Sequence, residues 1–152
     1  MIRSILIGIA AGQRAMSPLA AVAGAARRGA LPDGAFAKGL LENPVVASGA
    51  VAMAAAEMAG DKMKTAPDRI VPAGLIARTV TGGFAGAVLA RPGERKLAAL
   101  IAASTAIATS YVGWSIRMRA MKRFGQTGTG FVEDALVFGG AWAAANARGV
   151  RI

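Results

Sequence analysis

The feature that most constrains this chain is a series of five apolar segments, rich in Ala and Gly and separated by short basic linkers. Of the 18 Lys and Arg residues, only Arg14 and Arg78 interrupt such a segment. Small residues let helix backbones approach closely, which is how helices associate in lipid, where no hydrophobic force drives them together. The pattern predicts an all-α, integral membrane bundle of about four or five short transmembrane helices, formed by a single domain over residues 1–152.

Proline and charge mark the boundaries of these segments. The first is broken near Arg14 and Pro18 into two half-length pieces. Asn43-Pro44 predicts a helix start, because proline fits the first turn, where its missing N–H costs nothing. The predicted segments are 4–26, 44–60, 75–90, 97–115 and 131–147. Most have 16 to 19 residues, at the short end of the roughly 17–25 that a spanning helix needs.

Charge and hydropathy point to different partners. The net charge of +10 suits a polyanion, whereas 55% apolar residues and a mean hydropathy of +0.48 suit lipid. A nucleic-acid-binding domain spreads its basic residues over a folded surface or along one helix face, but here they lie mostly in the linkers. We therefore expect membrane lipids as partners and no nucleic acid.

The chain contains no Cys and no His. Their absence removes the Cys nucleophile, the commonest metal ligand and the usual general base at neutral pH. We expect no enzymatic activity, no metal and no cofactor.

A few charged residues fall inside or at the ends of the apolar segments, where each is costly unless paired or hydrated. Glu57 and Asp61, four residues apart, share a helix face. Arg14 lies at a helix break, where freed backbone groups line a cavity rather than face lipid. We expect Arg14 to contact an anionic group, and Glu57 and Asp61 to take a proton or cation or to hold the arginine. The candidate site residues are Arg14, Glu57, Asp61, Lys62, Arg78, Glu133 and Asp134.

This arrangement is typical of a transporter or channel for a small polar or ionic solute. The alternative is structural. Glu133 and Asp134 at a helix start are stabilised by the helix dipole, and Arg14 and Arg78 can pair with the carboxylates. The chain would then be a non-catalytic membrane scaffold or assembly factor.

Small residues also recur at a spacing of four, which permits close helix crossings. The positions are Gly8 with Gly12, Gly82 with Gly86, and Gly139 or Gly140. As a set they predict a tight bundle.

The basic residues outside the membrane give little orientation bias. They divide eight against eight if all five segments cross, and nine against seven if the first segment is re-entrant. Orientation normally follows such a bias. One hypothesis is that the chain inserts both ways and forms a homo-oligomer, specifically an antiparallel dimer; the alternative is that loop details set one orientation.

Three motifs resemble a bacterial multi-pass membrane family of unknown function, the domain of unknown function four-one-two-six. They are Gly12-x-Arg14-x-x-x-Pro18-Leu19, then Glu57-x-x-x-Asp61-Lys62 followed by Pro67-Asp68-Arg69, and Glu133-Asp134-Ala135-Leu136. Lys64 stands where family members often carry a proline. The resemblance implies a multi-pass protein of the inner (cytoplasmic) membrane and one constellation formed by Arg14, Glu57, Asp61, Lys62, Glu133 and Asp134, without an established activity.

Overall fold

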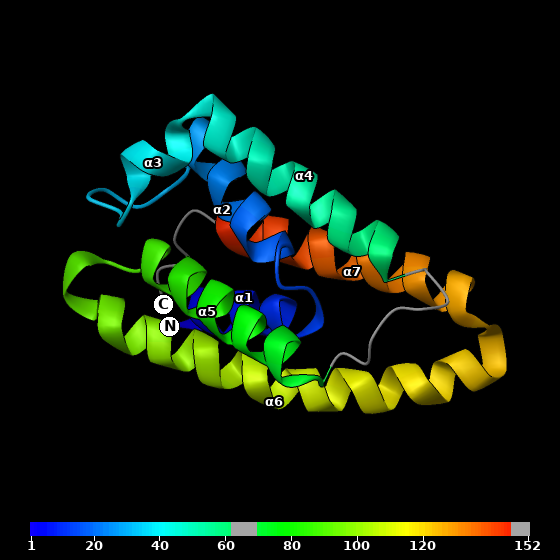
Figure 1. Cartoon of the computed structure of the whole chain (residues 1–152). Helices are drawn as coiled ribbons and strands as arrows, with labels where there is room; N and C mark the ends of the chain where they lie inside the picture. Colours follow the sequence, from blue (N-terminus) through cyan, green and yellow to red (C-terminus); the bar gives the residue numbers. More distant parts are fainter. Residues whose placement is uncertain (62–69, 147–152) are drawn as a thin grey trace.

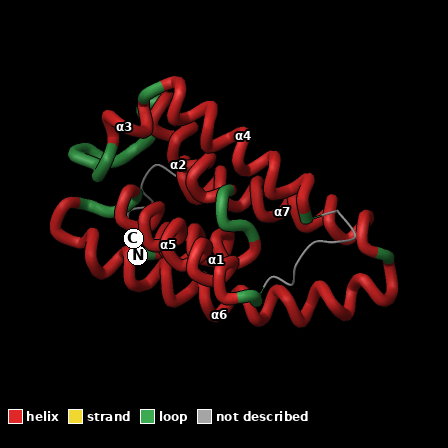
Figure 2. Tube along the Cα trace, in the orientation of Figure 1, coloured by secondary structure: helices red, strands yellow, loops and turns green. Residues whose placement is uncertain are grey.

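The computed structural model describes residues 1–61 and 70–146, with the side chains of 126 and 127 left out, and within them the chain is all-α. Seven α-helices and one 3-10 turn follow one another (Figures 1 and 2). They are α1 (Ile2–Gln13), α2 (Ser17–Arg27), α3 (Lys38–Glu42), α4 (Pro44–Gly60), α5 (Pro72–Val88), η1 (Pro92–Glu94), α6 (Arg95–Phe124) and α7 (Gln126–Asn146).

The predicted break in the first segment is confirmed. Helix α1 ends where Arg14 takes an extended conformation, with φ −143° and ψ 119°. Helix α2 then begins with Pro18 in its first turn, where a proline leaves no hydrogen bond unmade. The local sequence therefore produces two short helices instead of one.

The two half-helices fold back on each other, so both outer ends lie at the C-terminal end of α7. The Arg3 guanidinium donates to the carbonyls of Ala144 and Ala145, at 3.0 and 2.6 Å. Arg28, just after α2, donates to Asn146 Oδ1 at 3.0 and 3.2 Å. The chain thus enters the bundle along α1, turns at Arg14, and leaves along α2 on the same side.

Helix α4 has the predicted bounds. The Asn43 side chain accepts a hydrogen bond from Val45 N at 2.9 Å, and Pro44 follows as the first helical residue. Asn at this position satisfies one of the N–H groups that a helix start leaves without a partner.

The predicted end of segment 97–115 and the predicted start of segment 131–147 are wrong. Helix α6 continues past Ser115 to Phe124 and stops at Gly125, whose φ of +79° favours glycine. Helix α7 begins at Gln126, so Glu133 and Asp134 lie about two turns inside it and not at its start. The charges of this region therefore lie on helices and not in a linker.

Helices α1, α5 and α6 form one closely packed group, and α2 lies against α4 and α7 in the other (Figure 1). Glycines allow the helices of the first group to pack closely. A Cβ added at Gly8 would lie 2.6 Å from Ala102 O, and one at Gly86 would lie 2.7 Å from Ala98 O. Gly12 and Gly82 also face α6 at short range.

The predicted close crossing is therefore confirmed for Gly8 with Gly12 and for Gly82 with Gly86. It is wrong for Gly139 and Gly140, which have no neighbouring heavy atom within 4 Å of an added Cβ. The glycine spacing alone does not say whether a helix face meets another helix.

The distribution of apolar side chains is inverted relative to a water-soluble protein. Among the described residues, 26 apolar residues are buried and 19 of them are Ala. By contrast, 25 large apolar side chains are exposed, including Val45, Leu100 and Leu136 at 77%, 66% and 72%. Soluble proteins bury residues such as Leu, Ile and Phe first, so this surface is unusual for water.

Only one helical stretch in the described part is both long and apolar enough to cross a bilayer, namely Pro92–Phe124 with 33 residues. Ile2–Gln13 and Pro44–Gly60 are apolar but shorter. One such stretch does not by itself place a chain in a membrane.

Candidate functional site

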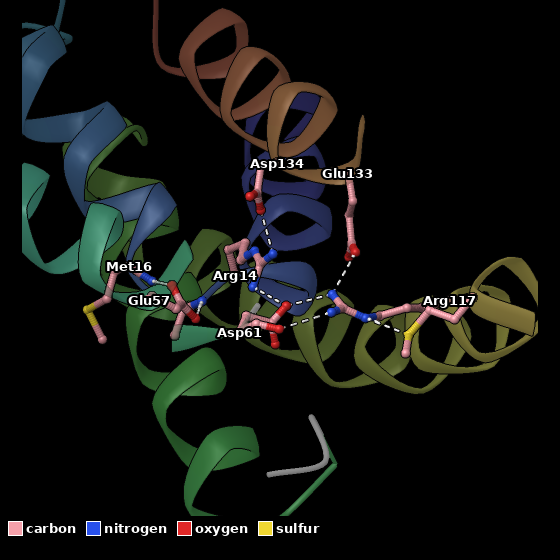
Figure 3. A network of polar contacts seen from close by, with 9 residues as sticks. Arg14, Met16, Glu57, Asp61, Arg117, Glu133 and Asp134 are labelled. Carbon is pink, nitrogen blue, oxygen red and sulfur yellow. Dashed lines mark hydrogen bonds and ion pairs between the residues drawn. The ribbon is translucent and has the colours of Figure 1, made fainter. Parts of the chain in front are cut away.

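The break between α1 and α2 is surrounded by charged side chains from α4, α5, α6 and α7, and Figure 3 shows those from α4, α6 and α7. Half of the chain's eight acidic residues belong to this group. The group, called the ionic cluster below, comprises Arg14, Glu57, Asp61, Arg78, Arg117, Glu133 and Asp134.

Arg14 is the centre of the cluster and is only 1% exposed. Its Nη1 lies 2.6 Å from Asp61 Oδ2, and its Nη2 pairs with Asp134 Oδ1. The fork of a guanidinium allows one side chain to hold two carboxylates. Arg14 thereby joins the break to the C-terminal end of α4 and to α7.

Arg117 of α6 forms a second bridge and is 7% exposed. Its Nη1 lies 2.5 Å from Asp61 Oδ2 and 3.0 Å from Glu133 Oε2. Its Nη2 also donates to the backbone oxygen of Asp61 at 3.3 Å. Asp61 is therefore shared by two arginines, and the pairs form a network across α4, α6 and α7 (Figure 3).

Glu57 contacts the backbone of the break, which was not predicted from the sequence. Its carboxylate accepts hydrogen bonds from Ala15 N and Met16 N, both at 2.8 Å. These N–H groups lie in the break and have no helical partner, and a buried unpaired N–H is costly. Glu57, one turn before Asp61, thus acts as a cap supplied by another helix.

Helix α6 satisfies other polar groups at the break. Ser110 Oγ donates to Gly12 O at 3.0 Å, and Gln13 Nε2 donates to Thr109 O at 2.8 Å. The break is held from both sides: by Glu57 on its N–H groups and by Ser110 on a carbonyl.

Arg78 of α5 is also buried, at 7% exposure. It interacts electrostatically with Glu57 and Asp61. Its place on the second turn of α5 puts a third guanidinium beside the carboxylates.

A cavity of about 880 Å³ reaches the cluster between α1, α6 and α7. Most of its walls are apolar, with Leu6 and Ile9 from α1, Ile116 from α6, and Val132 and Leu136 from α7. Arg117 and Glu133 belong to the wall as well. The pair that they form is the part of the ionic network that borders this space.

The structure brings together six of the seven predicted site residues; Lys62 lies outside the described residues. Arg117 was not among the residues predicted from the sequence, because it stands at the head of a basic run that resembles a linker. A signal was present: Arg117 continues the buried stripe of Ala98, Ala102, Ala106 and Ser110 at helical spacing.

Within residues 1–61 and 70–146, no group of three or more acidic side chains is arranged to hold a metal ion. The carboxylates of the cluster are bonded to guanidinium and backbone N–H groups instead.

Comparisons with known protein families, with curated protein sequences and with solved structures find no match. The resemblance to a multi-pass membrane family stays a prediction.

Proposed function

We propose that this chain is a multi-pass protein of the inner (cytoplasmic) membrane. The inverted distribution of apolar side chains supports this location, because lipid stabilises exposed Leu, Val and Phe whereas water does not. The most apolar window of Pro92–Phe124 is only 22% buried within the structure. A core helix of a soluble protein would be covered by its neighbours.

In this arrangement α4, α5, α6 and α7 cross the bilayer, and α1 with α2 forms a re-entrant pair. At 1.5 Å per residue, the 21 residues of α7 span about 30 Å from first to last, close to the roughly 30 Å of hydrocarbon. Asp134 then lies about 12 Å from one end of α7 and about 18 Å from the other. The ionic cluster would therefore lie inside the membrane and not among the headgroups.

We infer that the cluster is the site of a transporter or channel for a small polar or ionic solute. The observation that carries this inference is that Arg117 and Glu133 belong both to the ionic network and to the wall of the cavity. Charged groups at membrane depth are rare and typically mark ion or proton pathways. A broken helix beside them is typical of transport sites.

The geometry suggests how such a site would open. The Arg117–Glu133 pair connects α6 to α7 across the cavity, and α6 packs far more closely on α5 and α1 than on α7. Protonation of Glu133, or a solute ion bound in its place, would release Arg117 and weaken this connection. Asp61, held by Arg117 and Arg14, would then become reachable from the cavity.

Proton flux into liposomes that contain the full chain and a pH-sensitive dye tests this function. We expect flux above that of empty liposomes, and loss of most of it in Glu133→Gln, which cannot ionise. Glu42→Gln is the matched control, because Glu42 is exposed and its carboxylate pairs with Lys38 at 3.7 Å, outside the ionic cluster. Flux that equals that of empty liposomes, or that survives Glu133→Gln, would contradict the transport proposal for protons.

A membrane scaffold is the second candidate, and the pairing of Arg14 favours it. Arg14 holds Asp61 and Asp134, and Glu57 caps the break, so these charges serve the fold. A scaffold predicts that Asp134→Asn lowers the thermal unfolding midpoint in detergent, with no flux in either protein. A transporter predicts flux in the unsubstituted chain.

A further inference from the structure

The cavity between α1, α6 and α7 has the dimensions of one lipid chain. Its wall along α7 runs from Gly128 to Gly140, which is about 18 Å at 1.5 Å per residue. One leaflet contributes about half of the roughly 30 Å of hydrocarbon. An apolar chain entering from one leaflet would therefore match the length of the cavity.

One end of the cavity is strongly basic. Ala120 and Phe124 line it at the C-terminal end of α6, where Arg119, Lys122 and Arg123 are all exposed. Arg119 and Arg123 are four residues apart and share one side of the helix. The Arg123 guanidinium lies 5.7 Å from the centroid of the Phe124 ring, which lines the cavity, so it borders the cavity mouth. The sequence has no acidic residue between Arg117 and Glu133.

We propose that this cavity binds an anionic membrane phospholipid. One acyl chain lies between α6 and α7, and the phosphate lies at the mouth beside Arg119 and Arg123. The proposal rests on the membrane location of the proposed function, and it names a ligand that the ionic cluster does not require.

Charge complementarity selects the headgroup. Basic side chains next to a membrane helix attract anionic lipids, at about 1 kcal/mol for each residue near the surface. Arg117, deeper in the cavity, is already bonded to Asp61 and Glu133. The exposed arginines at the mouth therefore provide the positive charge for the phosphate.

The apolar walls of the cavity favour an acyl chain as the occupant. Leu6, Ile9, Val132 and Leu136 offer no hydrogen bonds, so most of the wall suits an apolar chain. Pockets of about 300–1,000 Å³ with apolar walls and a few polar groups at one place commonly hold a single ligand.

Native mass spectrometry of the full chain in detergent, with phosphatidylglycerol or phosphatidylcholine added, tests the headgroup. We expect phosphatidylglycerol to remain bound and phosphatidylcholine to dissociate. The double variant Arg119→Gln/Arg123→Gln should bind phosphatidylglycerol roughly 25-fold more weakly, about fivefold for each arginine. Lys122→Gln is the matched control, because helical geometry places residue 122 on the opposite side of α6 from Ala120 and Phe124.

Two glycines on α7 test the cavity itself. Gly140 lines it whereas Gly139 does not, and an added Cβ meets nothing within 4 Å at either position. Gly140→Phe should fill the cavity and displace phosphatidylglycerol, and Gly139→Phe should leave binding unchanged. Both variants should keep a normal thermal unfolding midpoint in lipid-free detergent, which shows that they fold.

Equal retention of the two lipids, or unchanged phosphatidylglycerol binding in the double variant or in Gly140→Phe, would overturn the lipid proposal. Flotation of the full chain with vesicles separates this failure from failure of the proposed function. A chain that does not float with vesicles has no membrane location, and both proposals fail. A chain that floats and conducts protons but does not distinguish the lipids contradicts this inference alone.

Discussion

At the scale of single residues, Arg14 decides whether the charged interior is stable. It is almost fully buried and holds Asp61 and Asp134 together. A buried ion pair adds little net stability over an apolar substitute, but removing one partner leaves an uncompensated charge and costs about 3–5 kcal/mol. The arginine is therefore difficult to replace even if it takes no part in transport.

We predict that Arg14→Ala lowers the free energy of unfolding by about 3–5 kcal/mol, because it removes the buried guanidinium that bridges Asp61 and Asp134. Arg14→Lys should recover only part of this loss, since an ammonium group lacks the fork that bridges two carboxylates. Unfolding in mixed detergent and denaturant measures both. Lys38→Ala, which removes an exposed cation, should change stability by less than about 0.5 kcal/mol. If Arg14→Ala were as mild as this control, the two bridges would carry no stability.

Glu57 allows a separate prediction, because it acts on the backbone. Glu57→Ala leaves the N–H groups of Ala15 and Met16 without their acceptor, and we expect a loss of about 1–3 kcal/mol for each. Glu57→Gln keeps one acceptor oxygen and should lose less. The same unfolding assay, with Glu42→Ala as control, measures the difference. Equal losses for Ala and Gln would show that charge, and not capping, is what Glu57 supplies.

At the scale of elements, two glycines of α5 allow the effect of close packing on stability to be measured apart from the effect of helix propensity. A Cβ at Gly86 would lie 2.6 Å from Ala102 Cβ, whereas one at Gly83 would lie 3.5 Å from its nearest neighbour, Ala99 O. We predict that Gly86→Ala destabilises the bundle by about 1–3 kcal/mol through overpacking. Gly83→Ala should be neutral or stabilising by up to about 1 kcal/mol, because Ala favours helix. Matching melting temperatures for the two variants would contradict the close crossing of α5 and α6.

Helix starts and breaks were predictable from the sequence where a local chemical signal marks them. Asn43-Pro44 fixes the start of α4, and the break near Arg14 and Pro18 follows from the same reasoning. Glu57 and Asp61 were predicted to share a helix face, and both carboxylates lie at the break.

The ends of α6 and α7 were not predictable in this way. In reading the sequence, we took a charged residue as the boundary of an apolar segment. Arg117 and Glu133 form an ion pair instead, and both lie on continuous helices. Such pairing joins residues 16 apart in the chain across two helices, and no local pattern reports it. The role of Glu57 as a cap on another helix is equally non-local.

At the scale of the whole molecule, the fold-back of α1 on α2 places both ends of this pair on one side of the bilayer in the proposed membrane arrangement. A re-entrant first segment places Arg3 on the side of Arg27 and Arg28, which is the nine-against-seven division of basic residues. This weak bias leaves open the hypothesis of dual insertion and an antiparallel homodimer.

Because the chain has no native Cys, single cysteines can report the topology. We predict that Ile2→Cys, Gly39→Cys and Gly93→Cys react with an impermeant reagent from one side of intact cells, and Lys122→Cys from the other. Dual insertion predicts partial labelling of all four from the same side. Labelling of Ile2→Cys and Gly39→Cys from opposite sides would contradict the re-entrant pair.

The central claim is that the large apolar side chains on the outside of the bundle face lipid. Spin labels at Leu100 and Val80, both highly exposed and outside the cavity wall, measure this directly in reconstituted vesicles, with a label at Lys122 as reference. We predict that dissolved oxygen, which concentrates in the bilayer, relaxes the Leu100 and Val80 labels more than a water-soluble nickel chelate does. We predict the reverse at Lys122. Greater access of the nickel chelate at Leu100 and Val80 would contradict the lipid-facing surface.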